Sequence, residues 1–241
     1  MQLKTSILAA TIGLLMGGIA FAQEPIKIKI GVLNDLSGTY ADLSGEGSVV
    51  AARMAVEDFK TAHPGRAVEL LTADHQNKPD VARAIARKWF DSEGVHAIAE
   101  LTTSAIALAV QKLAQERGRI VMISGAGSSD LTGKACSPTG FHWTYDTYAL
   151  ANGTARAIVE QGGKDWFFLT VDYAFGHELE KDVSDTVRAM GGKVIGGVQH
   201  PLGTADFASY HLQAQASGAQ VVGLANAGAD RSRQRPPRRI E

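Results

Sequence analysis

The sequence predicts an α/β fold arranged as two lobes, and three observations lead to this prediction. Short apolar runs alternate with longer segments in which apolar residues recur every three to four positions. No two-residue hairpin signal such as Asn-Gly separates two alternating strands. A break in the pattern lies past the middle of the chain. Alternation of strands and helices favours parallel sheets flanked by helices.

The N-terminal segment has the features of a secretory signal. Lys4 precedes an apolar run at 7–19, and Ala20 and Ala22 stand at positions −3 and −1 of a cleavage site before Gln23. The run is too short to span a bilayer comfortably, although a retained N-terminal anchor is the alternative. We expect residues 1–22 to be removed and the remainder to work outside the cytoplasm. Free nucleotide cofactors are scarce there, which favours binding or hydrolysis over hydride or phosphoryl transfer.

Seven apolar runs have the length and composition of buried parallel strands. They lie at 26–33, 67–73, 95–99, 120–124, 166–171, 193–198 and 220–224. Helical stripes of apolar residues lie between them. The stripes are Val81, Ala84, Ile85 and Trp89; Ile106, Ala109, Val110 and Leu113; and Leu179, Val183, Val187 and Met190.

The periodicity stops at 132–140, Thr-Gly-Lys-Ala-Cys-Ser-Pro-Thr-Gly, and an aromatic segment follows at 141–148. We place the lobe junction here, with the first lobe at 23–142 and the second at 143–230. Residues 231–241 are rich in Arg and Pro and are expected to be disordered. Both a flexible basic tail and a change of reading frame near Asp230 would explain them.

Composition excludes several classes of protein. The chain has 241 residues, of which 45% are hydrophobic, enough for a substantial core. A net charge of −1 provides no basic field for nucleic acid. Cys136 is the only cysteine, so an intramolecular disulfide is impossible, and we expect this residue to be structural rather than nucleophilic.

Motifs for cofactors, metals and catalysis are incomplete. The segment at 125–130 resembles a dinucleotide fingerprint, but Asp130 replaces the third glycine. The phosphate-loop spacing is wrong, with Ala135 where a hydroxyl residue is needed. No serine has the flanking glycine pair of a hydrolase elbow, and His177-Glu178 lacks the second histidine of a zinc motif. We expect no cofactor, no metal and no catalysis.

The loops after the predicted strands carry hydroxyl groups, small residues and a few aromatic rings. In open α/β sheets, ligands gather at the carboxyl ends of strands, beside helix N-termini that favour anions. Thr103 or Ser104 could donate to a carboxylate there, and Tyr173, Phe175 and Asn226 could complete the site from the second lobe. The alternative is that Ser104 and Ser128 only cap their helices.

Three segments together resemble one known family. They are 28–38, Ile-Lys-Ile-Gly-Val-Leu-Asn-Asp-Leu-Ser-Gly; 120–132, Ile-Val-Met-Ile-Ser-Gly-Ala-Gly-Ser-Ser-Asp-Leu-Thr; and 173–176, Tyr-Ala-Phe-Gly. With the signal segment, they resemble type I periplasmic solute-binding proteins of the branched-chain amino acid ABC transporter group, including the leucine/isoleucine/valine-binding proteins. The resemblance covers 26–230.

The resemblance implies a two-lobed α/β fold that closes on a small solute in the periplasm and delivers it to a membrane ABC permease. It implies a monomer that binds no nucleic acid. By motif position, the expected ligand-binding residues are Tyr40, Thr103 or Ser104, Ala126, Ser128, Asp146 and Phe175. Phe175 stands where amino-acid-binding relatives often carry Tyr. Other segments are more similar to the branch that binds aromatic or other small organic acids.

Family members continue well past the point at which this sequence stops resembling them. The resemblance therefore implies a fold that is incomplete at its C-terminus, a truncated and possibly frameshifted copy with impaired folding and transport. Two alternative functions remain at this stage. One is an exported serine hydrolase, and the other is a ligand-sensing receptor domain.

Overall fold

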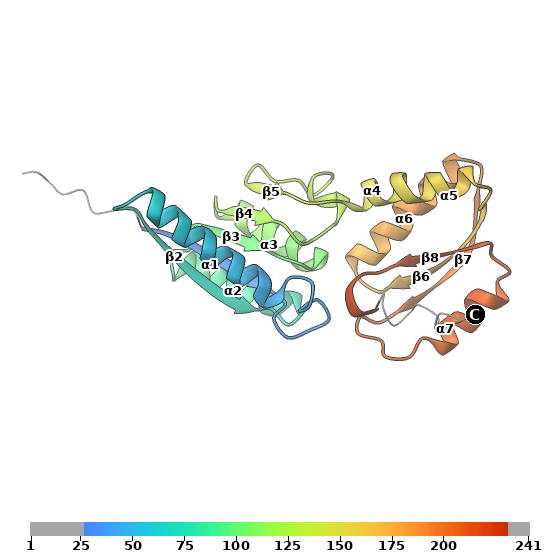
Figure 1. The fold of residues 1–241 in the computed structure, drawn as a ribbon, viewed down its shortest axis with the longest axis horizontal. Coiled ribbons are helices and arrows are strands. Elements are labelled where there is room, and N and C mark those ends of the chain that lie inside the picture. Colours follow the sequence, from blue (N-terminus) through green and yellow to red (C-terminus); the bar gives the residue numbers. More distant parts are fainter. Residues whose placement is uncertain (1–26, 231–241) are drawn as a thin grey trace, which may run out of the picture.

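The computed structural model describes residues 27–230, which form two lobes, each built on a parallel β-sheet (Figure 1). The predicted signal segment 1–22 and the tail 231–241 lie outside the described residues. Among the residues described, no helix is both long and apolar enough to cross a membrane.

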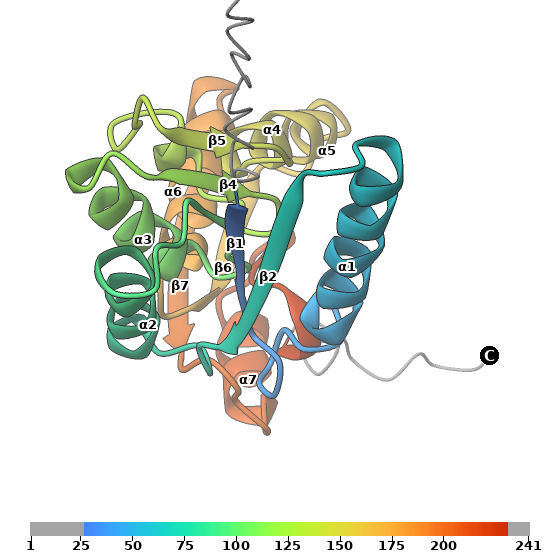
Figure 2. The same ribbon diagram turned by 90° about the vertical axis from the view of Figure 1, so that its left-hand side faces the viewer.

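The first lobe contains five strands in the order β2-β1-β3-β4-β5, all parallel. Its elements are β1 (Lys27–Asn34), α1 (Gly45–Ala62), β2 (Ala67–Asp74), α2 (Pro79–Asp91), β3 (Ala97–Glu100), α3 (Ser104–Glu116), β4 (Ile120–Ile123), a 3-10 turn (Ser129–Leu131) and β5 (Gly140–His142). Helix α1 lies on one side of the sheet, and α2 and α3 lie on the other (Figure 2).

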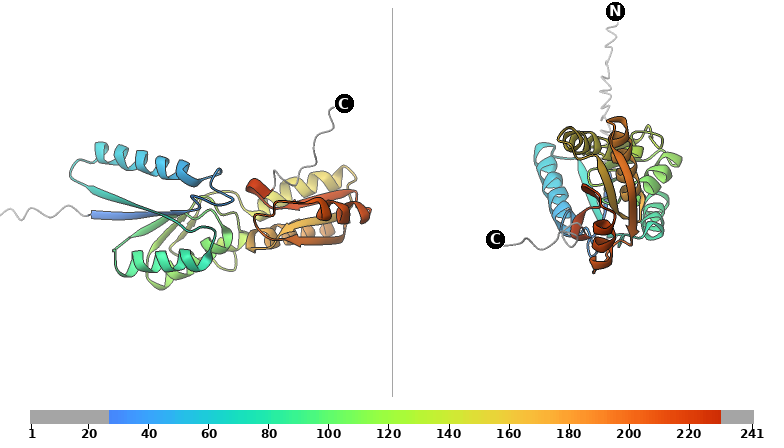
Figure 3. Two further views of the ribbon diagram at one scale, coloured as in Figure 1. Left: turned by 90° about the horizontal axis from the view of Figure 1, so that it is seen from below. Right: turned by 90° about the vertical axis from the view of Figure 1, so that its right-hand side faces the viewer.

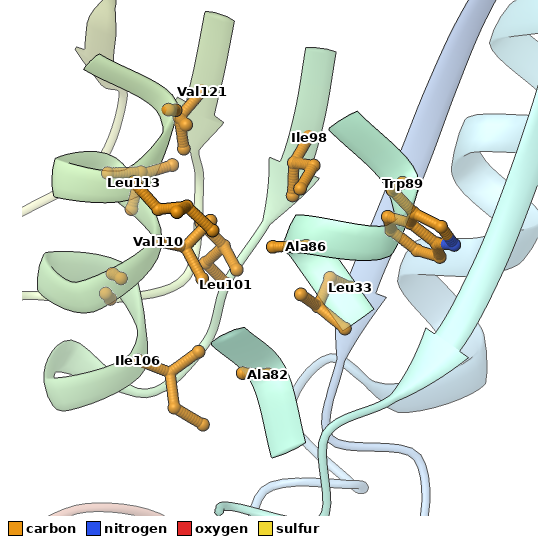
Figure 4. Packing of buried hydrophobic residues seen from close by; sticks show 14 of the residues in the cluster. Leu33, Ala82, Ala86, Trp89, Ile98, Leu101, Ile106, Val110, Leu113 and Val121 are labelled. Carbon is orange, nitrogen blue, oxygen red and sulfur yellow. The ribbon is translucent and has the colours of Figure 1, made fainter. Parts of the chain in front are cut away.

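The main core of this lobe lies under α2 and α3 (Figure 4). Seventeen buried residues form one cluster, in which Leu33 and Ile98 from the sheet meet Ile106 and Val110 from α3. The predicted apolar stripes of these helices therefore face the sheet, as amphipathic helices do. Gly31 allows the ring of Trp89 to lie directly against β1, since a Cβ there would clash with it.

A helical segment connects the lobes and begins the second one. It consists of α4 (Thr147–Leu150), a π-helical turn (Ala151–Ala155) and α5 (Arg156–Glu160). The second lobe continues with β6 (Asp165–Val171), α6 (Ala174–Ala189), β7 (Lys193–His200), α7 (Ala208–Ala216) and β8 (Val221–Ala225). Its strands are parallel in the order β7-β6-β8.

The central strand β6 is buried on both faces, so its sequence is continuously apolar. Trp166 and Phe168 pack in a cluster with Val187 of α6, while Phe167 and Leu169 point to the opposite face, towards Ala214 of α7. Helix α7 and helix α6 therefore cover different faces of this small sheet (Figure 3).

The predicted α/β class with parallel sheets is confirmed, and each of the seven predicted strands is present within a few residues of its expected bounds. The sequence analysis missed β5. This strand has only three residues and lies in the aromatic segment that was assigned to the junction, so it carries no strand-length apolar run.

Candidate functional site

A narrow cleft lies between the lobes, at the carboxyl ends of the first-lobe strands and the start of α6. It is lined by Tyr40, Leu43, Thr102, Ser104, Gly125, Gly127, Tyr145, Tyr173, Phe175 and Ala227. Its volume of about 20 Å³ has room for about one water molecule. The lobes are therefore close together, and a solute would have to displace the side chains that now meet across the cleft.

Hydrogen bonds fix the first-lobe wall beneath the cleft. Asn34, at the end of β1, is fully buried and accepts hydrogen bonds from the hydroxyls of Thr102 and Ser44. Its amide nitrogen donates to the carbonyl of Gly45 at 3.2 Å. The two hydroxyls also lie 2.7 Å apart. This network joins the loops after β1 and β3 to the start of α1.

A second network holds the loop before α3. Asp35 accepts hydrogen bonds from the backbone N–H groups of Gly38 and Tyr40 and from the side-chain amide of Asn77. The carbonyl oxygen of that amide accepts from the Thr103 hydroxyl at 2.5 Å. Of the two hydroxyls that the sequence could not separate, that of Thr103 is therefore already occupied within the protein.

The Ser104 hydroxyl is in the opposite situation. Ser104 is the first residue of α3 and is 1% exposed, yet its Oγ is buried without a hydrogen-bond partner among the described residues. A buried polar atom without a partner costs free energy. The N-terminus of a thirteen-residue helix also presents free N–H groups and a partial positive charge. A hydroxyl and a helix N-terminus together suit an anion.

Backbone strain lies immediately before this helix. Glu100 and Leu101 have φ values of +83° and +59°, in the left-handed region that residues with a Cβ rarely adopt. The carboxylate of Glu100 accepts from the Ser124 hydroxyl at 2.5 Å, and the Leu101 side chain is fully buried in the first-lobe core. The surroundings thus hold the strained turn that brings Thr102 and Ser104 to the cleft, and strain of this kind is common at binding sites.

Aromatic rings from both lobes also line the cleft. The hydroxyls of Tyr40 and Tyr173 lie 2.5 Å apart and form a hydrogen bond between the lobes. The ring of Tyr173 stacks on that of Phe175, with centroids 6.3 Å apart. Burial raises the pKa of both tyrosines above the ordinary phenol value, so both phenols stay protonated and neutral.

Gly127 makes room for these rings. A Cβ at this position would stand 2.8 Å from the Tyr145 ring, closer than real Cβ atoms come, and 3.0 Å from the Phe175 ring, closer than most do. The absence of a side chain therefore lets two aromatic rings approach the loop after β4.

Polar contacts between the lobes continue along α6, beside the cleft. The Ser128 hydroxyl donates to the carboxylate of Glu178, and the Ser129 hydroxyl donates to Asp182 at 3.1 Å. Asp130 also lies beside Glu178 and forms an ion pair with Lys134 at 2.7 Å. Burial raises the pKa of Glu178 to about 7, and the neighbouring Asp130 contributes to the rise.

His75, which lies below the first-lobe wall, is fully buried after β2. Its Nδ1 accepts from the backbone N–H of Asn77 at 3.1 Å. Burial lowers its pKa to about 4, although the nearby Asp35 and Asp74 act in the opposite direction. His75 is therefore neutral at pH 7.

The structure brings four of the predicted site residues to the cleft wall, namely Tyr40, Ser104, Tyr173 and Phe175. The other five predicted site residues do not line the cleft. Thr103 bonds Asn77, Ser128 bonds Glu178, Ala126 is buried with its carbonyl 2.7 Å from Nε2 of His142, Asp146 caps α4 by accepting from the N–H of Ala149, and Asn226 borders a larger groove of the second lobe.

The sequence analysis did not select Thr102 or Tyr145, which also line the cleft. Thr102 belongs to the strand-end loop before α3, and Tyr145 belongs to the aromatic segment at 141–148. The position of Tyr145 at the junction of the lobes was the available signal, because a residue there can reach both of them.

The second lobe also carries a larger groove, with a volume of about 520 Å³, which is lined by Trp166, Phe168 and the residues of β8 among others. It is wider than the cleft but is lined mainly by apolar side chains and an open sheet edge. Binding sites for small molecules combine apolar walls with a few convergent polar groups. The cleft provides these groups, so we take the cleft as the candidate site. No cluster of metal-ligating side chains occurs within 27–230.

Comparison with known proteins supports the two-lobed fold. The family model described as periplasmic binding protein matches residues 27–232. The Leu/Ile/Val-binding protein homolog 6 of Brucella abortus is 25% identical over 224 residues, which are 91% of this chain and 55% of the relative. The chain thus spans about half the length of the curated relatives it matches.

Two solved structures are informative neighbours. A periplasmic binding protein from Burkholderia mallei is 50% identical, with a TM-score of 0.82, over 85% of this chain and 55% of that one. A solute-binding protein of an ABC transporter from Rhodopseudomonas palustris, in complex with p-hydroxybenzoic acid, is 28% identical, with a TM-score of 0.71 and the same coverage.

Proposed function

We propose that this chain, which belongs to the periplasmic binding protein family, captures a small carboxylate-bearing solute between its lobes as the binding component of an ABC uptake transporter. The family and its fold are those of substrate-binding transport proteins. The site residues, the solute and the permease partner belong to the proposal.

One observation carries the proposal. The Ser104 hydroxyl is buried in the cleft without a partner, at the N-terminus of α3. The hydroxyls around it are already engaged, since Thr102 and Thr103 bond Asn34 and Asn77. A carboxylate that accepts from Ser104 would satisfy the orphaned hydroxyl and lie at the positive end of the helix dipole.

The cleft walls favour an aromatic acid over a branched-chain amino acid. Among the described residues that line the cleft, none carries a carboxylate that could pair with an ammonium group. The sequence offered Asp146 and Asp230 for this role, but Asp146 caps α4, and Asp230 accepts a hydrogen bond from the N–H of Gly203. The rings of Tyr40, Tyr145, Tyr173 and Phe175 provide flat apolar surfaces. The Rhodopseudomonas palustris relative that holds p-hydroxybenzoic acid supports the same ligand class.

Calorimetric titration of the purified protein with benzoate, 4-hydroxybenzoate and leucine would test the proposal. We expect heat of binding for the aromatic acids and none for leucine. The Ser104→Ala variant should bind about tenfold to a hundredfold more weakly, because hydrogen bonds to charged groups contribute about 1.5–3 kcal/mol.

Ser209→Ala is the matched control, because Ser209 is exposed in the first turn of α7, outside the cleft. This variant should bind like the unmodified protein. Equal affinities in the Ser104→Ala and unmodified proteins would remove Ser104 from the site. Binding of leucine with no binding of aromatic acids would leave the solute-binding function standing and overturn the ligand class.

A further inference from the structure

Three carboxyl groups gather where helix α6 of the second lobe touches the loop after β4. Asp130 belongs to the 3-10 turn of the first lobe, whereas Glu178 and Asp182 belong to α6. The side chains of Asp130 and Asp182 are only 18% and 13% exposed, and Glu178 is half-buried. The contact between the lobes therefore places acidic groups next to one another, partly out of reach of water.

The hydroxyl groups at this contact are already committed. Ser128 donates its one hydroxyl proton to Glu178, and the same oxygen accepts from the backbone N–H of Asp130. Ser129 donates to Asp182 at 3.1 Å. The carboxyl group of Asp130 lies within hydrogen-bonding reach of that of Glu178. Ionised carboxylates only accept hydrogen bonds, so these two can bond each other only when one of them carries a proton.

The cations beside the three carboxyl groups are well solvated. Lys134 lies 2.7 Å from Asp130, but its side chain is 78% exposed. Lys181 is also exposed, and it lies 2.8 Å from Asp185 and 3.9 Å from Asp182. Exposed ion pairs contribute little free energy, so the two lysines offset the repulsion between the buried carboxylates only in part. A proton bound at the contact would remove that repulsion.

We propose that Asp130 and Glu178 form a proton-dependent latch between the lobes. Closing the cleft brings the two carboxyl groups together, and the closed arrangement takes up one proton, which the pair shares. When the lobes separate, the two groups return to water and release the proton. The latch rests on the proposed capture of a solute between the lobes, because it acts on the closure that holds the solute.

The direction of the pH dependence follows from where the proton binds. Burial raises the pKa of Glu178 from 4.5 to about 7, and Asp130 contributes to the rise. Separated lobes would leave Glu178 in water, where its pKa returns towards the ordinary value. Protonation therefore favours closure fully below about pH 4.5, and this advantage is lost as the pH rises through about 7. Affinity for a solute should fall about tenfold from pH 6 to pH 8.

Calorimetric titration with 4-hydroxybenzoate would test the latch at pH 6 and pH 8. Each titration is repeated in two buffers that differ in enthalpy of ionisation, which gives the number of protons taken up on binding. The carboxyl group of this probe is ionised at both pH values, so the uptake reports on the protein. We expect uptake of about one proton at pH 6 and almost none at pH 8. Glu178→Gln should take up none and should bind equally well at both pH values.

His177→Gln is the matched control on the same helix. His177 directly precedes Glu178, and histidine is the usual cause of pH dependence near neutrality. Its Nε2 lies 2.9 Å from Asp172, and both side chains are exposed. This variant should keep the proton uptake of the unmodified protein. Two outcomes would overturn the latch, namely binding without proton uptake at pH 6 and uptake that His177→Gln abolishes. The first needs no variant, so it remains decisive if Glu178→Gln fails to fold.

A measurement without solute separates the latch from the proposed function. Spin labels on Cys136, which is exposed in the first lobe, and on Ser209→Cys in α7 would report the distance between the lobes by electron resonance. The population with separated lobes should grow from pH 6 to pH 8, and Glu178→Gln should abolish this change. If the change occurs but no solute binds, the proposed function fails and the latch stands. A distance distribution that does not depend on pH would overturn the latch even if a solute binds.

Discussion

The two lobes contribute different chemistry to the cleft. The first lobe presents short polar side chains from its strand ends, held in place by a dense hydrogen-bond network, together with the single ring of Tyr40. The second lobe contributes Tyr173 and Phe175, large rings near the start of one helix. The hydrophobic cores of the two lobes also differ in size. One cluster of seventeen residues supports the first lobe, whereas two smaller clusters lie on opposite faces of the second.

This difference indicates that the lobes have separate roles. A preorganised polar wall on a large core suits recognition of a charged group, because its dipoles need little rearrangement. Rings on a smaller core with an open sheet edge can adjust to the size of a solute. We therefore expect the first lobe to be the more resistant to local unfolding.

The largest effect is expected from a cavity in each core. Leu33→Ala should lower the free energy of unfolding by about 2–5 kcal/mol, because Leu33 is fully buried in the first-lobe cluster. Leu169→Ala should cost less, near the lower end of that range, because Leu169 belongs to a small cluster beside an open groove that can collapse around the change. Urea denaturation followed by circular dichroism would measure both. Equal losses would contradict the distinction between the cores.

An intermediate effect is expected where the lobes touch through phenols. Tyr40→Phe and Tyr173→Phe each remove the hydrogen bond between the lobes and should each lower stability by about 0.5–1.5 kcal/mol. The double variant should lose no more than the larger single loss, because both changes remove the same bond. Additive losses in thermal denaturation would show that the two phenols act independently.

The smallest effect is expected in the pH dependence of stability. The pKa of Glu178 is raised from 4.5 to about 7, so the folded chain binds this proton more tightly than the unfolded chain. Its stabilising contribution is complete below about pH 4.5 and is lost as the pH rises through about 7. The pKa of His75 is lowered from 6.5 to about 4, so its contribution is present above pH 6.5 and is lost as the pH falls through about 4.

Glu178→Gln should remove the loss between pH 4.5 and 7 and leave the acid-side loss from His75 in place. The control is Glu160→Gln, because Glu160 is exposed at the end of α5, away from the contact between the lobes. Melting temperatures measured from pH 4 to pH 8 would separate the two groups. A profile for Glu178→Gln that matches the unmodified protein would show that the titration of Glu178 does not cause this loss.

Most of the fold could be predicted from sequence because its signals are local. Because β6 is buried on both faces, its sequence is a continuous apolar run. Because α3 has one buried face, its apolar residues recur with a helical period. β5 could not be predicted, because three residues define no period. Its pairing with β4 comes from the tertiary structure.

The candidate site was less predictable, because its hydroxyl residues look alike in sequence. Thr103 and Ser104 are adjacent, and only the position of Asn77, 26 residues away, determines which hydroxyl is occupied. The partner of Ser128 is likewise Glu178, which lies 50 residues away in the other lobe. Long-range partners of this kind leave no local pattern.

The strained turn at Leu101 narrows the range of residues that evolution or design could accept there. Glycine would relieve the left-handed backbone, but it would leave a hole in the first-lobe core where the leucine side chain is fully buried. Valine or isoleucine would fill more of that hole and would fit the backbone less well than leucine. Position 101 therefore tolerates few substitutions, because its backbone favours glycine while its buried side chain favours a large apolar residue.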